Sequence, residues 1–169
     1  MKNYKDNTSG EWDFRKPTDG WHLIQFGDGI DYLKNKKGEV WEDEKTGQKA
    51  LKLPALVADE KDESNGLDAS IIVPVTEGGE QRMANILAAC GLYKKFAERF
   101  PGDIGMFNKD VLDAIKVKLP GQTMKVRLET NKKGKQNFVE YTTADAKVEN
   151  KNPAPLGSSA PPAQAGMDW

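Results

Sequence analysis

The same four-residue turn occurs twice in this chain of 169 residues, and both copies separate runs of strand-forming residues. Residues 35–38 and residues 131–134 both have the sequence Asn-Lys-Lys-Gly. Asn and Gly tolerate the backbone angles that tight turns need, so each copy predicts a turn between two strands. Next to the second copy, residues 124–130 alternate apolar and charged side chains, which is the period of a strand with one face on a core.

Strand-forming residues gather in five regions of the chain. The predicted strands, in chain order, are residues 21–32, residues 39–41 with 50–58, residues 67–75, residues 124–130 and residues 136–143. Gly27 and Gly29 in the first region predict a bulge or a sharp bend. Pro54 in the second predicts an edge position or a kink, because proline cannot donate to a strand ladder.

The hydrophobic period changes to that of a helix between the third and fourth strands. Residues 80–90 carry apolar side chains at helical spacing, and Gly91 is suited to end that helix in a left-handed cap. Residues 92–100 add one or two further turns. Asn108 is placed to cap a short helix that runs through Ile115.

This order of elements predicts a β-rich α+β protein. Five strands with helices after the third is the order of an OB-fold, a small Greek-key barrel. Its loops between strands one and two and between strands four and five flank the nucleic-acid groove, and the two lysine turns fall on those loops.

We expect a flexible arm over residues 1–19 and an OB-fold nucleic-acid-binding domain over residues 20–146. Residues 147–169 are predicted to be a disordered linker with a partner-binding tip, because Pro, Ala, Gly and Ser bury too little apolar surface to offset the entropy of ordering.

Side chains near the two lysine turns have the chemistry of single-strand binding, in which cations follow phosphates and bases stack on aromatic rings. The candidate phosphate-binding cations are Lys36, Lys37, Lys125, Arg127, Lys132, Lys133 and Lys135. The candidate stacking rings are Tyr32, Trp41, Phe138 and Tyr141. The alternative is that Lys-Lys-Gly is ordinary turn chemistry, that the lysines guard strand edges against aggregation, and that some of the rings belong to the core.

The last residues, Met167-Asp168-Trp169, place an aromatic ring and a carboxylate at the end of the Pro- and Ala-rich stretch. Asp168 and Trp169 are therefore candidates for docking a partner protein. The alternatives are an ordinary frayed terminus and a Trp169 that folds back onto the body.

Composition excludes several classes of chemistry. His22 is the only histidine and Cys90 the only cysteine, so a zinc site of the common kind cannot form within one chain. We predict no catalytic residue, no metal and no cofactor, and a protein that is not an enzyme.

Three features favour a cytoplasmic protein that binds no membrane. They are the single cysteine, the lack of an apolar signal region and the lack of a membrane-length apolar run. A net charge of −1 argues against a simple polycation, although lysines gather in some segments and carboxylates in others.

Five segments together resemble a family. They are residues 20–26, the first lysine turn, residues 84–91, residues 119–128 and residues 133–141. In order and pattern the chain resembles a bacteriophage single-stranded DNA-binding protein of the OB-fold type. The resemblance implies sequence-independent binding of single-stranded DNA during phage DNA replication, repair or recombination in the host cytoplasm. It also implies that the C-terminal tip recruits replication or recombination proteins, although this tip has one Asp instead of an acidic cluster and ends in Trp instead of Phe.

A second class of function fits the same sequence. The chain is also consistent with a protein-interaction module, such as a phage adaptor or an inhibitor of a host enzyme, that binds no nucleic acid and works through its acidic loops. The sequence leaves open whether the protein is a homo-oligomer and whether it prefers DNA or RNA.

Overall fold

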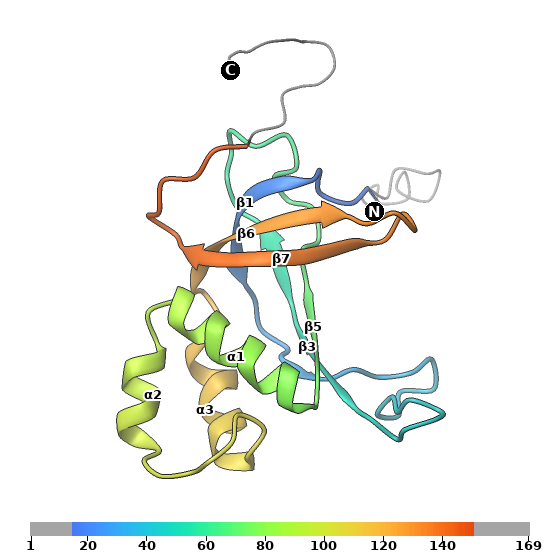
Figure 1. Ribbon diagram of the computed structural model, residues 1–169, viewed down its shortest axis with the longest axis vertical. Coiled ribbons are helices and arrows are strands. Elements are labelled where there is room, and N and C mark those ends of the chain that lie inside the picture. The colour runs from blue at the N-terminus through green and yellow to red at the C-terminus, as the bar shows by residue number, and fades with distance from the viewer. Residues whose placement is uncertain (1–14, 151–169) are drawn as a thin grey trace, which may run out of the picture.

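Antiparallel strands make up one part of the molecule, and three helices gather at its other end (Figure 1). The computed structural model describes residues 15–150. The strands are β1 (Gly20–Phe26), β2 (Asp31–Tyr32), β3 (Ala50–Leu53), β4 (Ala55–Val57), β5 (Ile71–Pro74), β6 (Thr123–Thr130) and β7 (Gln136–Thr143). The helices are α1 (Glu77–Ala89), α2 (Tyr93–Arg99) and α3 (Lys109–Lys118), and they lie between β5 and β6 as predicted.

The strands form two sheets, with the orders β4-β1-β6-β7 and β2-β3-β5. The mixture of antiparallel strands and helices is confirmed, but the strands of the predicted barrel do not close into one continuous sheet. Within the described residues, β5 and β7 do not pair with each other. Helix α1 contacts both of these strands, so a helix covers the core where a closing strand pair would otherwise lie.

Two strand breaks carry the chain from one sheet to the other. The first predicted strand divides into β1 and β2 around Gly29, which has a φ of 90°. The second divides into β3 and β4 at Pro54. The two breaks face each other, because the N–H of Gly27 donates to the Pro54 carbonyl oxygen at 2.9 Å. The predicted bend and kink are therefore both present, and they are a single feature.

Side chains at the helix ends explain where the helices begin. The Thr76 hydroxyl accepts from the Gly79 N–H at 3.0 Å, so α1 begins earlier than the predicted residue 80. Gly91, with a φ of 74°, follows its end as predicted. The Asn108 side chain accepts from the Asp110 N–H at 2.9 Å and caps α3, which also confirms the prediction.

One apolar core fills the space between the sheets and the helices. Ile24, Leu51, Ile71, Ile86 and Met124 have no exposed surface. They come from both sheets and from α1, so the alternation seen in the sequence points to one shared core. Within residues 15–150, no helix combines the length and the apolar surface needed to cross a bilayer.

Cys90 packs against this core as a partly buried thiol. Burial raises its pKa to about 12. The thiolate is the reactive form of cysteine, so Cys90 is chemically quiet at neutral pH.

The neighbouring glycines at the start of α1 give a matched test of the packing between α1 and β5. A Cβ on Gly79 would lie 1.7 Å from the Pro74 carbonyl oxygen, whereas on Gly78 its nearest neighbour would be 3.9 Å away. We expect Gly79→Ala to lower the free energy of unfolding by about 3 kcal/mol or more, because backbone must move. Gly78→Ala should raise it by about 0.5–1 kcal/mol. Urea unfolding measures both, and equal stability of the two variants would contradict the packing described.

Candidate nucleic-acid interface

The two lysine turns have the same internal geometry. In the first, the Asn35 side-chain oxygen accepts from the backbone N–H of Lys37 at 2.9 Å and of Glu39 at 3.1 Å. In the second, the Asn131 oxygen accepts from Lys133 at 2.9 Å and from Lys135 at 3.0 Å. The repeated sequence therefore builds a repeated structure, in which one amide oxygen satisfies two turn N–H groups.

Glycine and a backbone pair complete each turn. Gly38 and Gly134 have φ values of 82° and 80°, which only glycine adopts readily. The residue that begins each turn also donates its N–H at 2.8 Å to the carbonyl oxygen four residues later, which is Glu39 in one turn and Lys135 in the other. Each turn is thus a closed, hydrogen-bonded platform for its lysines.

The lysine amines on both turns project into solvent. Lys36, Lys37, Lys132, Lys133 and Lys135 are all exposed. Within residues 15–150, none of the five forms an ion pair. In Figure 1 the loop between β2 and β3 and the tip of the β6–β7 hairpin both lie on the right-hand side of the molecule, one below the other. The depression described below is lined by other residues than those of the two turns.

Trp41 is the exposed aromatic ring next to a lysine turn. Trp41 is 36 % exposed. Its backbone N–H donates to the Leu33 carbonyl oxygen at 2.8 Å, which places the residue directly after the turn on the returning chain. Its neighbour Val40 pairs with Lys34 across the same small hairpin. The Trp41 side chain is thus partly open to solvent and lies three residues after the first turn in the chain.

The other three candidate rings lie against the core. Tyr32, Phe138 and Tyr141 are partly buried and pack on the core cluster. The Tyr141 hydroxyl is buried without a hydrogen-bond partner among the described residues, and burial raises its pKa. Tyr32 keeps one contact with a cation, since the Lys49 amine lies 6.0 Å from its ring centroid. Roles for these rings in base stacking stay predictions.

Lys125 and Arg127 share the outer face of β6, as the alternation predicts, but both have partners. The Lys125 amine donates to the Ala146 carbonyl oxygen at 2.6 Å. The Arg127 guanidinium lies 2.8 Å from Glu129 and 2.6 Å from Glu140. The hydrogen bonds that the guanidinium donates to these two carboxylates raise the pKa of Arg127, and the carboxylates compensate its charge. These two cations are therefore less available to a phosphate than those on the turns.

Two residues that sequence reasoning missed lie on the outer face of the smaller sheet. Lys52 on β3 pairs with Ile72 on β5, and both are exposed, Ile72 by 40 %. Figure 1 shows β3 and β5 behind β7 and descending toward the loop that carries the first lysine turn. The alternation of residues 50–53 and 71–74 was the available signal, because it separates this cation and this aliphatic side chain from the core.

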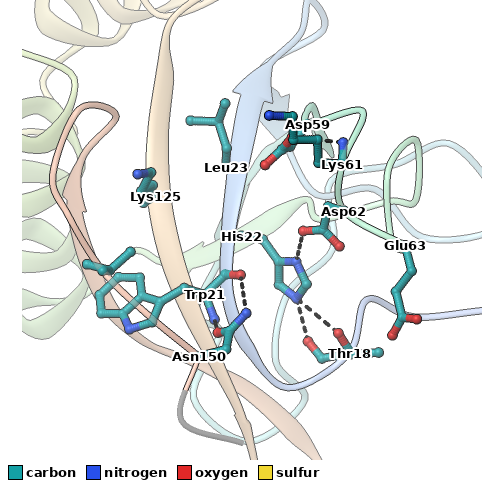
Figure 2. A pocket seen from close by; sticks show the side chains of 11 residues that line it. Thr18, Trp21, His22, Leu23, Asp59, Lys61, Asp62, Glu63, Lys125 and Asn150 are labelled. Atoms are coloured by element: carbon teal, nitrogen blue, oxygen red, sulfur yellow. Dashed lines mark hydrogen bonds and ion pairs between the residues drawn. The ribbon is translucent and has the colours of Figure 1, made fainter. Parts of the chain in front are cut away.

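The only histidine is held in a polar cluster at the start of β1 (Figure 2). His22 is 3 % exposed, with Nδ1 lying 2.5 Å from an Asp62 carboxylate oxygen. Its Nε2–H donates to the Thr18 carbonyl oxygen at 2.6 Å. Both ring nitrogens thus bind structural partners and fasten the chain before β1 to the acidic loop 58–66. An open depression of about 490 Å³ beside this cluster is lined by Trp21, Lys125 and acidic side chains.

Both ends of the described chain are fastened to the sheet. Before β1, the Asp19 carboxylate accepts from the backbone N–H and the hydroxyl of Thr130 at 3.1 and 2.8 Å. After β7, the Asn150 side chain binds both backbone groups of Trp21 (Figure 2). The predicted arm and tail therefore include fixed residues near the domain. Residues 1–14 and 151–169, with Asp168 and Trp169, lie outside the described part of the chain.

Comparison with known proteins adds no assignment. No family model matches the chain, and no curated protein is significantly similar to it. The site therefore has to be interpreted from its own geometry.

The Asn131 amide gives a direct test of the turn geometry. Asn131→Ala removes the acceptor for two N–H groups and should lower the free energy of unfolding by about 1 kcal/mol. Amide hydrogen exchange at Lys133 and Lys135 should become faster. Asn131→Asp is the control, because its carboxylate keeps an acceptor oxygen in the same place. Unchanged exchange in Asn131→Ala would show that the side chain does not close the turn.

Proposed function

We propose that this protein binds single-stranded DNA without regard to sequence, through the exposed surface that the two lysine turns flank. The observation that carries the proposal is the pair of matching turns. Each presents solvent-exposed lysines without ion pairs to other described residues on a backbone fixed by its own asparagine. Phosphate groups are bound by such cations with little sequence preference.

The available contacts suit a flexible single strand. Lysines of the turns would follow the phosphates at two places, and Trp41 would stack on a base beside the first turn. Lys52 and Ile72 would contribute a cation and an aliphatic contact on the sheet surface. Within this proposal, Lys125 and Arg127 have a smaller part, because their charges already have partners.

The strand order supports an open variant of the OB-fold. If β1 and β2 count as strand one and β3 and β4 as strand two, the neighbours run in the order five, four, one, two, three. An OB-fold has this order together with a pair between strands three and five. Here α1 contacts both of those strands in place of the pair. The loops that hold the lysine turns are those that border nucleic acid in such folds.

The proposal extends to a role in phage DNA replication, repair or recombination, without chemistry on the strand. The resemblance described from the sequence supports this role.

Charge reversal at both turns is the main test. A variant with four Lys→Glu changes should lose binding of a fluorescent oligothymidine and keep the wild-type melting temperature. The changed residues are Lys36, Lys37, Lys132 and Lys133. The control is Lys94→Glu with Lys95→Glu, which places the same kind of charge change on exposed lysines of α2, away from the turns in Figure 1. In single Lys→Ala variants of the turns, the slope of log K against log salt should fall in magnitude by about 0.7 for each lysine. Wild-type affinity in the quadruple variant would remove the turns from the interface.

Trp41 supplies an independent readout. Trp41→Ala should weaken oligothymidine binding by about 1–3 kcal/mol, whereas Trp41→Phe keeps a stacking ring and should retain most of the affinity. Fluorescence titration at fixed salt measures both. Equal losses in the two variants would mean that the indole has a structural role beside the turn.

The competing function is a protein-interaction module that works through its acidic loops. A wild-type protein that binds neither oligothymidine nor an RNA oligonucleotide at low salt would favour that module. Binding of RNA with equal affinity would keep the interface and widen the class of ligand.

A further inference from the structure

The tip of the β6–β7 hairpin extends past the end of the strand that supports it. β1 ends its pairing with β6 at Gly20, which lies opposite Leu128. Glu129 and Thr130 continue the ladder with β7 alone, and the second lysine turn follows them. A two-stranded hairpin is only marginally stable by itself in water. The direction in which this turn presents its lysines therefore depends on what contacts the last rung of the ladder.

The chain before β1 makes that contact at a single rung, which Thr130 and Gln136 form. The Asp19 carboxylate accepts from the Thr130 N–H at 3.1 Å and from the Thr130 hydroxyl at 2.8 Å. The Gln136 side-chain amide donates to the same carboxylate at 3.0 Å and to the Pro17 carbonyl oxygen at 2.8 Å. Residues 17–19 therefore hold both strands of the hairpin directly before the lysine turn.

Residues 17–19 are themselves fixed to the body of the domain. Pro17 is buried, and the Thr18 N–H donates to the hydroxyl of the buried Ser64 at 3.1 Å. The Thr18 carbonyl oxygen accepts from the buried His22 ring at 2.6 Å (Figure 2). The segment thus connects the hairpin tip to buried polar groups on β1 and on the acidic loop.

The Asp19 carboxylate is held in its charged form by the hairpin. Burial works against the charge, but the hydrogen bonds from Gln136 and Thr130 outweigh it and hold the pKa of Asp19 below its ordinary value. A carboxylate beside a cationic turn should repel phosphate. Its hydrogen bonds to the hairpin, and not its charge toward a ligand, therefore explain an anion at this place.

We propose that residues 17–19 are a brace that sets the direction of the second lysine turn, and that Asp19 is a positioning residue for Lys132 and Lys133. This inference rests on the proposed function, since it gives the direction of these two amines a purpose. The turn keeps its own closed geometry through Asn131, while the brace aims it from the larger sheet. Loss of the brace should turn the lysines away without opening the turn.

Residual dipolar couplings test the brace without nucleic acid. In Asp19→Ala, the couplings of the Lys133 and Lys135 amides should change relative to those of β1, because the hairpin tip loses its support. Hydrogen exchange at the same two amides should stay slow, because Asn131 still accepts from them. Asp19→Asn is the matched control, since its side-chain oxygen can still accept from Thr130, and it should change the couplings less. Unchanged couplings in Asp19→Ala would overturn the brace whether or not the protein binds DNA.

Double-mutant cycles with a fluorescent oligothymidine connect the brace to binding. Asp19→Ala should lower the affinity although it removes a negative charge, and the slope of log K against log salt should fall in magnitude by up to about 1.4, as if two phosphate contacts were lost. Changing Lys132 and Lys133 to Ala should then have little further effect. Changing Lys36 and Lys37 to Ala is the control, and it should cost as much in Asp19→Ala as in the wild type.

The outcomes separate the brace from the interface. If both lysine pairs keep their full cost in Asp19→Ala, the brace is overturned and the interface stands. Tighter binding by Asp19→Ala would also overturn the brace, because the carboxylate would then act only through its charge. If neither lysine pair affects binding in the wild type, the proposed function is overturned, and the purpose of the brace with it. Gln136→Ala removes the other half of the brace without a change of charge, and it gives the deciding cycle if melting curves show that Asp19→Ala is not folded.

Discussion

The hydrogen bond from Gly27 to Pro54 lies where both long strands change sheets, and the arrangement of the two sheets depends on it. Proline has no N–H to offer a ladder, and glycine tolerates the bend opposite it. Both breaks occur at one place. The two long strands therefore stay paired on both sides of it, as β1 with β4 in the larger sheet and as β2 with β3 in the smaller sheet. Two small sheets can therefore enclose one core, and the loop with the first lysine turn leaves from the far end of the smaller sheet.

The charges on this protein fall into two groups with different chemistry. One group is compensated, as with Arg127 between Glu129 and Glu140 or Lys109 against Asp113. The other group consists of the lysines on the turns, which extend from a fixed backbone without partners among the described residues. A chain with a net charge of −1 can thus carry groups of lysines without ion-pair partners among the described residues, although Glu39, Glu42, Asp43 and Glu44 follow the first turn in the same loop.

Local patterns predicted much of this structure. The hairpin of β6 and β7, the caps at Gly91 and Asn108, the break at Pro54 and the two turns all follow from residues close together in the chain. The missing pair between β5 and β7 could not be predicted in this way, because it depends on how α1 packs against both strands and no short pattern indicates that packing. The ion pair between Arg127 and Glu140 could not be predicted either, because the two residues are neighbours only across the β6–β7 ladder. The sequence likewise could not predict that Trp41 is exposed and Tyr141 partly buried. Both residues occur in similar local sequences, and tertiary packing decides their exposure.

The Asn150 amide changes what the border of β1 offers to another strand. β4 ends its pairing with β1 near Leu23, whose carbonyl oxygen accepts from the Ala58 N–H at 2.9 Å. Beyond that point the backbone of Trp21 would present an open N–H and C=O at a strand border, which is a template for intermolecular β-pairing. The Asn150 side chain binds both groups as a peptide would. One side chain therefore occupies both backbone groups of Trp21, at a border of β1 where a further strand could otherwise pair.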